Sequence, residues 1–252
     1  MSTASSTTLP ATPSQPALSE PERLINVFFA PTKTFADIRR NASWWVPFIL
    51  ISLFSYALVF TVDKKVGFEQ VSENQIKMNH RAMEQMDQLS PADRARRMDI
   101  SVKVTKVISY VIPLFILLSD VVIAAVLMAT FNFGLGAEVK FGQALAIVMY
   151  AGIVTLLKPI LAIVSLLAGS NVEAFNFSNP VGTNPAYYMS LDSATGWLYH
   201  MVGWFDVFTI WLFVLIGVGF AVVGRKKISS GVAVMIGWFI VLVLVTTGWA
   251  AM

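Results

Sequence analysis

Five stretches of this chain are apolar over about the 20 residues that an α-helix needs to cross a bilayer. They lie at about 44–62, 105–130, 141–168, 197–224 and 229–251. Overall, 56% of the residues are hydrophobic and only 13% are charged, whereas about 25% are charged in soluble globular domains. The sequence therefore predicts an all-α integral membrane protein with about five transmembrane helices, in a membrane domain over 44–252.

Two segments precede the first span. Residues 1–18 carry no charge and are rich in Ser, Thr, Pro and Ala, which predicts a disordered tail. In residues 19–43, Ser19 and Glu22 have the spacing of a capping box, and Pro31 separates two short amphipathic helices, the second of which ends in Arg39 and Arg40. Such helices beside a span are typical of a segment in the membrane interface. A soluble linker is the alternative.

The loops predict the orientation. The turn between the last two spans contains Arg225, Lys226 and Lys227, whereas residues 169–196 contain no Lys or Arg. The positive-inside rule then puts the N-terminus in the cytoplasm and the C-terminus outside. The expected location is the inner (cytoplasmic) membrane. Loop 63–104 conflicts with this assignment, because it would lie outside although it carries eight Lys and Arg residues.

Loop 63–104 is itself expected to be helical. Apolar residues recur in it at steps of three and four, and Ser90 followed by Pro91 is a helix start signal. We expect an extramembrane helical hairpin whose last helix continues into the second span.

Three ionisable residues fall within the predicted spans, namely Asp120, Lys158 and Asp206. Each costs about 2.5–3.5 kcal/mol to insert at mid-membrane. Lys158 and Asp206 lie at similar depths, about 14–15 Å from the outer ends of their spans at 1.5 Å per residue. Asp120 lies deeper, so Lys158 and Asp206 are expected to pair.

Two prolines lie within spans, Pro113 in the second and Pro159 in the third. Proline lacks an N–H, so each should kink its helix, and Pro159 should free the carbonyl group of Thr155. We expect the ammonium group of Lys158 to satisfy freed acceptors at the kink while it pairs with Asp206.

The role of these charges stays open between two interpretations, an ion pair that fixes helix packing and a site on an ion or substrate pathway. No pattern supports catalysis. The two aspartates lack the GxGD-type turn of aspartyl intramembrane proteases, and the chain has no cysteine. We expect a protein that is not an enzyme and has no cofactor or metal. Gly217 and Ala221 form a small-residue face suited to close helix packing.

Three segments resemble the bacterial branch of the Yip domain (Ypt/Rab-interacting protein) family of polytopic membrane proteins. They are "RLINVFFAPTKTFADIRRNASWWVPFIL" (23–50), "VKFGQALAIVMYAGIVTLLKPILAI" (139–163) and "NPAYYMSL" (184–191). The resemblance implies five spans with a cytoplasmic N-terminus and supplies no catalytic residues. Eukaryotic members are associated with membrane traffic and Rab-type GTPases, but their "DLYGP"-like motif is absent here, which argues against GTPase binding.

The resemblance and the residues together favour a non-catalytic scaffold or membrane-organising protein. The alternative is a small transporter or channel component that uses Lys158, Asp206 and Asp120. The expected partners are the lipid bilayer and other membrane proteins or further copies of this chain, with no nucleic acid.

Overall fold

The computed structural model describes residues 16–170, 172–189 and 196–250, and within these ranges it is helical and contains no strand. Residues 1–15, which make up most of the predicted tail, lie outside the described residues. The helices are α1 (Glu20–Phe29), α2 (Pro31–Ile38), α3 (Trp45–Lys65), α4 (Phe68–Lys77), α5 (His80–Asp87), α6 (Pro91–Leu135), α7 (Phe141–Gly152), α8 (Leu157–Leu167), α9 (Trp197–Gly203), α10 (Val207–Val223) and α11 (Ile228–Ala250), with 3₁₀ turns η1 (Ile153–Leu156) and η2 (Pro185–Tyr188).

Four helical segments in the described part are long and apolar enough to cross a membrane: α3, α6, the α7–α8 unit and α11. A fifth candidate consists of α9 and α10 together, which are bent by 55° at a break between them. The predicted all-α membrane architecture is confirmed, with four spans or five if the bent pair is one span. The stretch 197–224, expected as one helix, is thus two helices.

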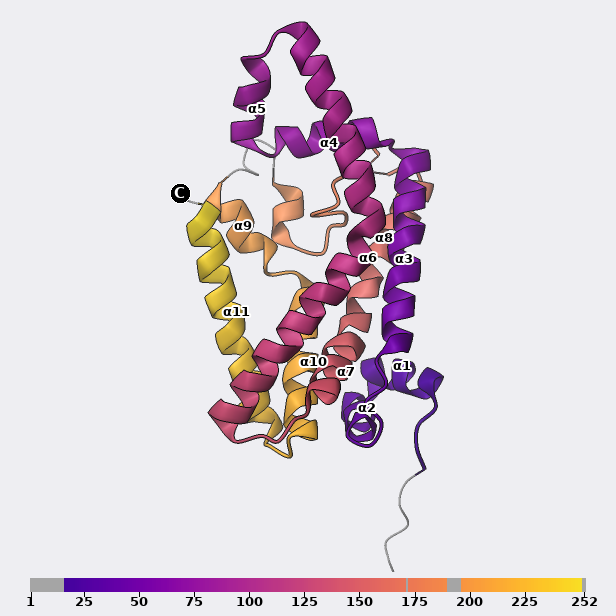
Figure 1. Cartoon of the computed structure of the whole chain (residues 1–252), viewed down its shortest axis with the longest axis vertical. Helices are drawn as coiled ribbons and strands as arrows, with labels where there is room; N and C mark the ends of the chain where they lie inside the picture. The colour runs from indigo at the N-terminus through magenta and orange to yellow at the C-terminus, as the bar shows by residue number, and fades with distance from the viewer. Residues whose placement is uncertain (1–15, 171, 190–195, 251–252) are drawn as a thin grey trace, which may run out of the picture.

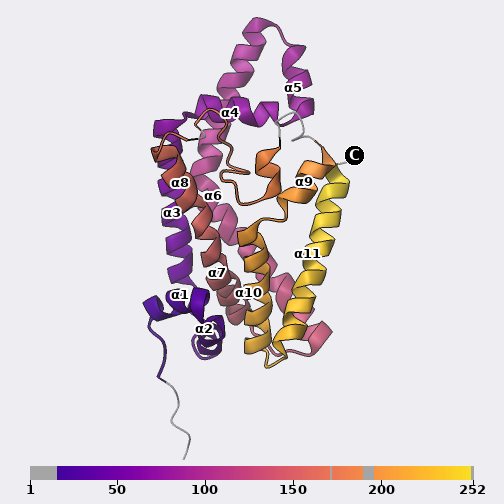
Figure 2. The same cartoon turned by 180° about the vertical axis from the view of Figure 1, so that it is seen from behind.

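The two ends of the bundle carry different elements. Helices α1 and α2 and the turn between α10 and α11 lie at one end, at the bottom of Figure 1, and α4 and α5 lie at the opposite end. Figure 2 shows the same arrangement from behind. The segments expected on the cytoplasmic side therefore share one end of the molecule.

Helix α7 is at the centre of the core. Its residues 144–151 are all buried, because α6, α10, α2 and α3 pack around it. A helix that is apolar on every side suits such a position. Beside it, the rings of Phe131 on α6 and Phe220 on α10 stack with centroids 4.5 Å apart.

Helix α6 is far longer than a membrane span. Its 45 residues measure about 68 Å at 1.5 Å per residue, more than twice the hydrocarbon thickness of about 30 Å. The predicted start is confirmed, since the side chain of Ser90 accepts a hydrogen bond from the Asp93 N–H and Pro91 is the first helical residue. Further along, α6 packs against α4, where the Ser72 and Thr105 hydroxyl groups are 3.2 Å apart.

The two prolines have different surroundings. Helix α6 continues through Pro113 without a break. Before Pro159, the chain leaves α-helical geometry for the 3₁₀ turn η1, in which the Leu157 N–H donates to the Val154 carbonyl. Helix α8 then begins two residues before Pro159. The missing N–H of Pro159 gives a reason for the irregular turn just upstream.

Candidate functional site

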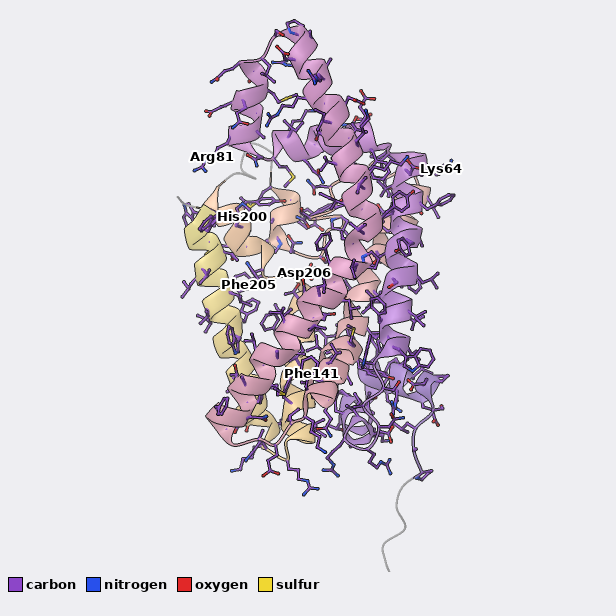
Figure 3. The ribbon with its side chains drawn as sticks, in the orientation of Figure 1. Lys64, Arg81, Phe141, His200, Phe205 and Asp206 are labelled. Carbon is purple, nitrogen blue, oxygen red and sulfur yellow. The ribbon has the colours of Figure 1, made fainter. Side chains whose placement is uncertain are left out.

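The structure brings Lys158 and Asp206 together. Nζ of Lys158 on α8 lies 2.9 Å from Oδ1 of Asp206, which immediately precedes α10. Figure 3 shows Asp206 near mid-height in the bundle, behind α6. The ion pair therefore links the α7–α8 unit to the break between α9 and α10.

Asp206 is the N-cap of α10. Its Oδ1 accepts hydrogen bonds from the backbone N–H groups of Phe208 and Thr209, both at 3.0 Å. An N-cap carboxylate satisfies amides that have no partner within the helix and interacts favourably with the positive end of the helix dipole. The α9–α10 break thus positions the carboxylate, because Asp206 can cap only where the helix starts.

The loop before η2 provides a further partner for Asp206. The hydroxyl group of Thr183 donates to Oδ2, and the Val207 N–H donates to the Thr183 carbonyl at 3.2 Å. The side chain of Asp206 is only 2% exposed, so both oxygens of a buried carboxylate are hydrogen-bonded. Sequence reasoning missed Thr183, since nothing in the pattern of residues 169–196 indicates which side chain turns inward.

The Lys158 side chain is less buried than that of Asp206 and is 28% exposed. Besides Asp206, its ammonium group approaches the hydroxyl oxygen of Thr209 at 3.4 Å. Within the described residues, no hydrogen bond joins Nζ to the Thr155 carbonyl group. The expectation that Lys158 satisfies the acceptors freed by Pro159 was therefore wrong. The reason is that Asp206 and Thr209 across the helix interface hold the ammonium group.

A cavity of about 710 Å³ lies beside the pair. Both Lys158 and Asp206 line it, together with residues of α3, α6, the 176–186 segment and α9. Asp120 is not among the lining residues, and no ion pair or hydrogen bond of its side chain is found in the described part of the chain. Pro159 lines the cavity and Pro113 does not. Of the five residues singled out from the sequence, three thus gather at one place.

A second buried charge cluster lies at the other end of the bundle, where α1 and α2 meet α7. Nε and Nη2 of Arg23 donate to Oδ2 of Asp37 at 2.8 and 2.5 Å, and both side chains are at most 2% exposed. Nη2 of Arg40 donates to Oδ1 at 2.7 Å. Burial by itself raises the pKa of the Asp37 carboxyl, but the hydrogen bonds from Arg23 and Arg40 outweigh it and hold the pKa below its ordinary value.

This cluster joins α1 to the core. The Tyr150 hydroxyl group on α7 donates to Oε2 of Glu20, and Arg23 lies 6.0 Å from the centre of the Tyr150 ring. The Thr34 hydroxyl group donates to the Arg23 carbonyl at 2.9 Å. Sequence reasoning did not find this cluster, because Arg23 and Asp37 each look like ordinary polar residues of short amphipathic helices.

Among the described residues, no group of three or more acidic or histidine side chains is arranged to hold a metal ion. The bundle of long apolar helices with a charged pair between two of them defines a multi-pass α-helical membrane protein. The family model described as Yip1 domain matches residues 25–251, so the chain belongs to the Yip1 domain family. No curated protein and no solved structure matches it. The Yip1 family is generally non-enzymatic, and its members interact with lipid membranes.

Proposed function

We propose that this chain is a non-catalytic, membrane-organising protein of the Yip type, in which α1 is a fixed apolar platform in the membrane interface. The proposed membrane is the inner (cytoplasmic) membrane, with α1, α2 and the N-terminus on its cytoplasmic side. The proposed partners are the bilayer itself and other membrane proteins or further copies of the chain.

The observation that carries this proposal is the contrast between the two faces of α1. Arg23 and Val27, one turn apart, are buried against the bundle, whereas Ile25 and Phe29, also one turn apart, are 60% and 84% exposed. On the inner side, the ring of Phe28 packs edge-on against Trp211 at 5.6 Å. An apolar pair that points away from the bundle beside a span suits insertion at the level of the lipid headgroups.

A buried ion pair and a hydrogen bond to the core explain why such a platform would be rigid. Arg23 is bonded to Asp37 on α2, and Glu20 is bonded to Tyr150 on α7. Removing one partner of a buried pair leaves an uncompensated charge, which costs about 3–5 kcal/mol. A helix fixed in this way can transmit a local change in the bilayer to the spans, or impose one on the bilayer.

The experiment reconstitutes the purified full chain into phosphatidylcholine–phosphatidylglycerol vesicles and measures vesicle size and shape by electron cryo-microscopy. Wild type is compared with Ile25→Ser/Phe29→Ser and with Met83→Ser, which changes an exposed apolar side chain on α5 at the other end. We expect wild type and Met83→Ser to alter the vesicles alike, and the double variant to leave them like protein-free vesicles. Equal effects of all three proteins would contradict the proposal.

A second candidate, a small transporter or channel component, is favoured by the cavity beside Lys158. Intramembrane charges that face water commonly mark ion or substrate pathways. The measurement is ion flux into liposomes loaded with a pH-sensitive or chloride-sensitive dye. Flux that exceeds protein-free liposomes and disappears in Lys158→Met/Asp206→Asn would favour this function, and flux equal to protein-free liposomes would exclude it for these ions.

A further inference from the structure

The cavity beside Lys158 has the size of a ligand site. Its volume of about 710 Å³ falls within the range of about 300–1,000 Å³ that small-molecule pockets occupy. Its wall is built from segments far apart in the sequence, with Ser55 on α3, Ser109 on α6, Asn179 before η2 and Tyr199 on α9. Polar groups from four separate segments of the chain therefore converge on one cavity.

The charge that a ligand would meet in this cavity is positive. Lys158 and Asp206 are the lining residues that carry a full charge, and the lining also includes one histidine, His200. The Asp206 carboxylate is 2% exposed and accepts hydrogen bonds on both oxygens, whereas the Lys158 side chain is 28% exposed. Because the anion is covered and the cation is open, the pair presents an ammonium group to the cavity.

The ammonium group also has capacity for another acceptor. It carries three N–H donors, of which one is directed to Asp206 at 2.9 Å and a second makes a long contact of 3.4 Å with Thr209. In the described residues no further acceptor is bonded to Nζ. An anionic oxygen placed here would gain a charge-assisted hydrogen bond.

The rest of the wall has a polar side and an apolar side. The apolar side chains come mainly from α3 and α6, with Ile51, Leu58, Ile112 and Ile116 beside the two serines, and the polar side includes Asn179, Asn184 and Tyr199. A ligand that fills both sides needs a polar, anionic end and an apolar portion. Phosphate esters attached to acyl chains are the most abundant anionic groups in a bilayer.

We propose that this cavity binds a phosphate ester, with Lys158 as the counter-charge of the phosphate and Asp206 as the residue that positions Lys158. The same chemistry is found in a phospholipid headgroup and in a soluble phosphate ester such as glycerol 3-phosphate. The inference does not depend on the membrane-organising role of α1, since the cavity and α1 involve different residues.

The experiment measures the thermal unfolding temperature of the full chain in a non-ionic detergent against increasing concentrations of three probes. They are dioctanoyl phosphatidylglycerol, glycerol 3-phosphate and dioctanoylglycerol, which has the same chains without phosphate. A ligand that binds the folded state raises the unfolding temperature with its concentration. We expect a rise with dioctanoyl phosphatidylglycerol and none with dioctanoylglycerol. A rise with glycerol 3-phosphate as well would identify a soluble phosphate ester as a source.

Three variants locate the binding. Lys158→Met/Asp206→Asn removes both charges and keeps a capping side chain, and Ser55→Leu fills part of the cavity while both residues of the pair stay unchanged. Ser119→Leu is the matched control, an exposed serine of α6 outside the cavity. The first two variants should raise the apparent Kd for dioctanoyl phosphatidylglycerol at least about tenfold. The control should bind this probe like wild type. The proposal would be overturned if neither phosphate ester raised the unfolding temperature of wild type. It would also be overturned if the rise were equal in all four proteins, or if dioctanoylglycerol produced the same rise.

Discussion

Oδ1 of Asp206 lies 2.9 Å from Nζ of Lys158 and, at the same time, accepts the backbone N–H groups that open α10. One carboxylate oxygen therefore serves two purposes, closing an ion pair between α8 and α10 and starting a helix in the interior of the bundle. A substitution at Asp206 that removes the ion pair and the helix cap together cannot show how much each contributes to stability.

Lys158→Met and Asp206→Asn, singly and together, separate the ion pair from the cap, because asparagine is also a good N-cap residue. Each single change leaves one buried or half-buried charge without its partner. We expect each to reduce the free energy of unfolding by about 2 kcal/mol, less than for a fully buried pair because Lys158 is partly exposed. The double variant should recover most of the loss. Thermal unfolding in detergent measures all four proteins.

Additive losses in that cycle would show that the two charges do not depend on each other. Asp206→Leu adds a further comparison, since it also removes the cap and should cost about 1 kcal/mol more than Asp206→Asn.

Gly231→Ala should destabilise the α10–α11 contact. A Cβ at Gly231 would lie 2.3 Å from the Gly217 carbonyl oxygen and 2.7 Å from Cβ of Ala221. Overpacking of this kind costs about 1–3 kcal/mol. Gly237→Ala on the same helix is the control, because its Cβ would meet nothing within 4 Å. Equal unfolding temperatures of the two variants would contradict the close packing.

Most of the fold could be predicted from the sequence, because membrane spans are marked by length and hydropathy alone. The capping box of Ser19 and Glu22 and the start of α6 at Ser90 are local signals, and both are confirmed. The break before α10 could not be predicted from hydropathy, since residues 197–224 are apolar on both sides of it. In hindsight, an Asp directly before the long apolar run of α10 is an N-cap signal.

The candidate site was predictable in part. Matched depth selected Lys158 and Asp206, but depth says nothing about which loop residue turns toward them, so Thr183 was missed. The small-residue face of Gly217 and Ala221 was visible, whereas its partner Gly231 depends on how α10 and α11 are placed in space. Arg23 and Asp37 form their pair only because α1 and α2 fold back on each other.

Asp37 should make stability depend on pH under acidic conditions. Its pKa in the folded protein is held below the ordinary 3.8. Its contribution to the free energy of unfolding is therefore fully present above about pH 5 and is lost as pH falls through the folded-state pKa. Asp37→Asn should lower the unfolding temperature at pH 7 and weaken its decline between about pH 5 and pH 2. Unfolding temperatures measured across this range provide the test.

The control for that experiment is Asp87→Asn, whose carboxylate pairs with Arg94 on the surface and is 69% exposed. Surface ion pairs contribute about 0–1 kcal/mol, so this variant should follow wild type. If Asp37→Asn also follows wild type at every pH, the buried pair does not fix α2.

The orientation can be measured directly, because the chain has no cysteine. Single cysteines at the exposed positions Lys33, Lys227 and Gln88 are treated with a membrane-impermeant maleimide in whole cells. We expect labelling of Gln88→Cys in intact cells, and of Lys33→Cys and Lys227→Cys only after permeabilisation. The reverse pattern would mean that the charged loop 63–104 follows the positive-inside rule and that the N-terminal segment and the α10–α11 turn do not.

The most direct test of the membrane-organising account is the depth of residue 29 in reconstituted vesicles. A spin label on Phe29→Cys is compared with one on Lys33→Cys by its collisions with oxygen, which partitions into lipid, and with a water-soluble nickel complex. The account predicts that oxygen dominates at residue 29 and the nickel complex at residue 33, since α1 points Phe29 away from the bundle into lipid. Equal access of the nickel complex to both labels would place α1 in water and contradict it.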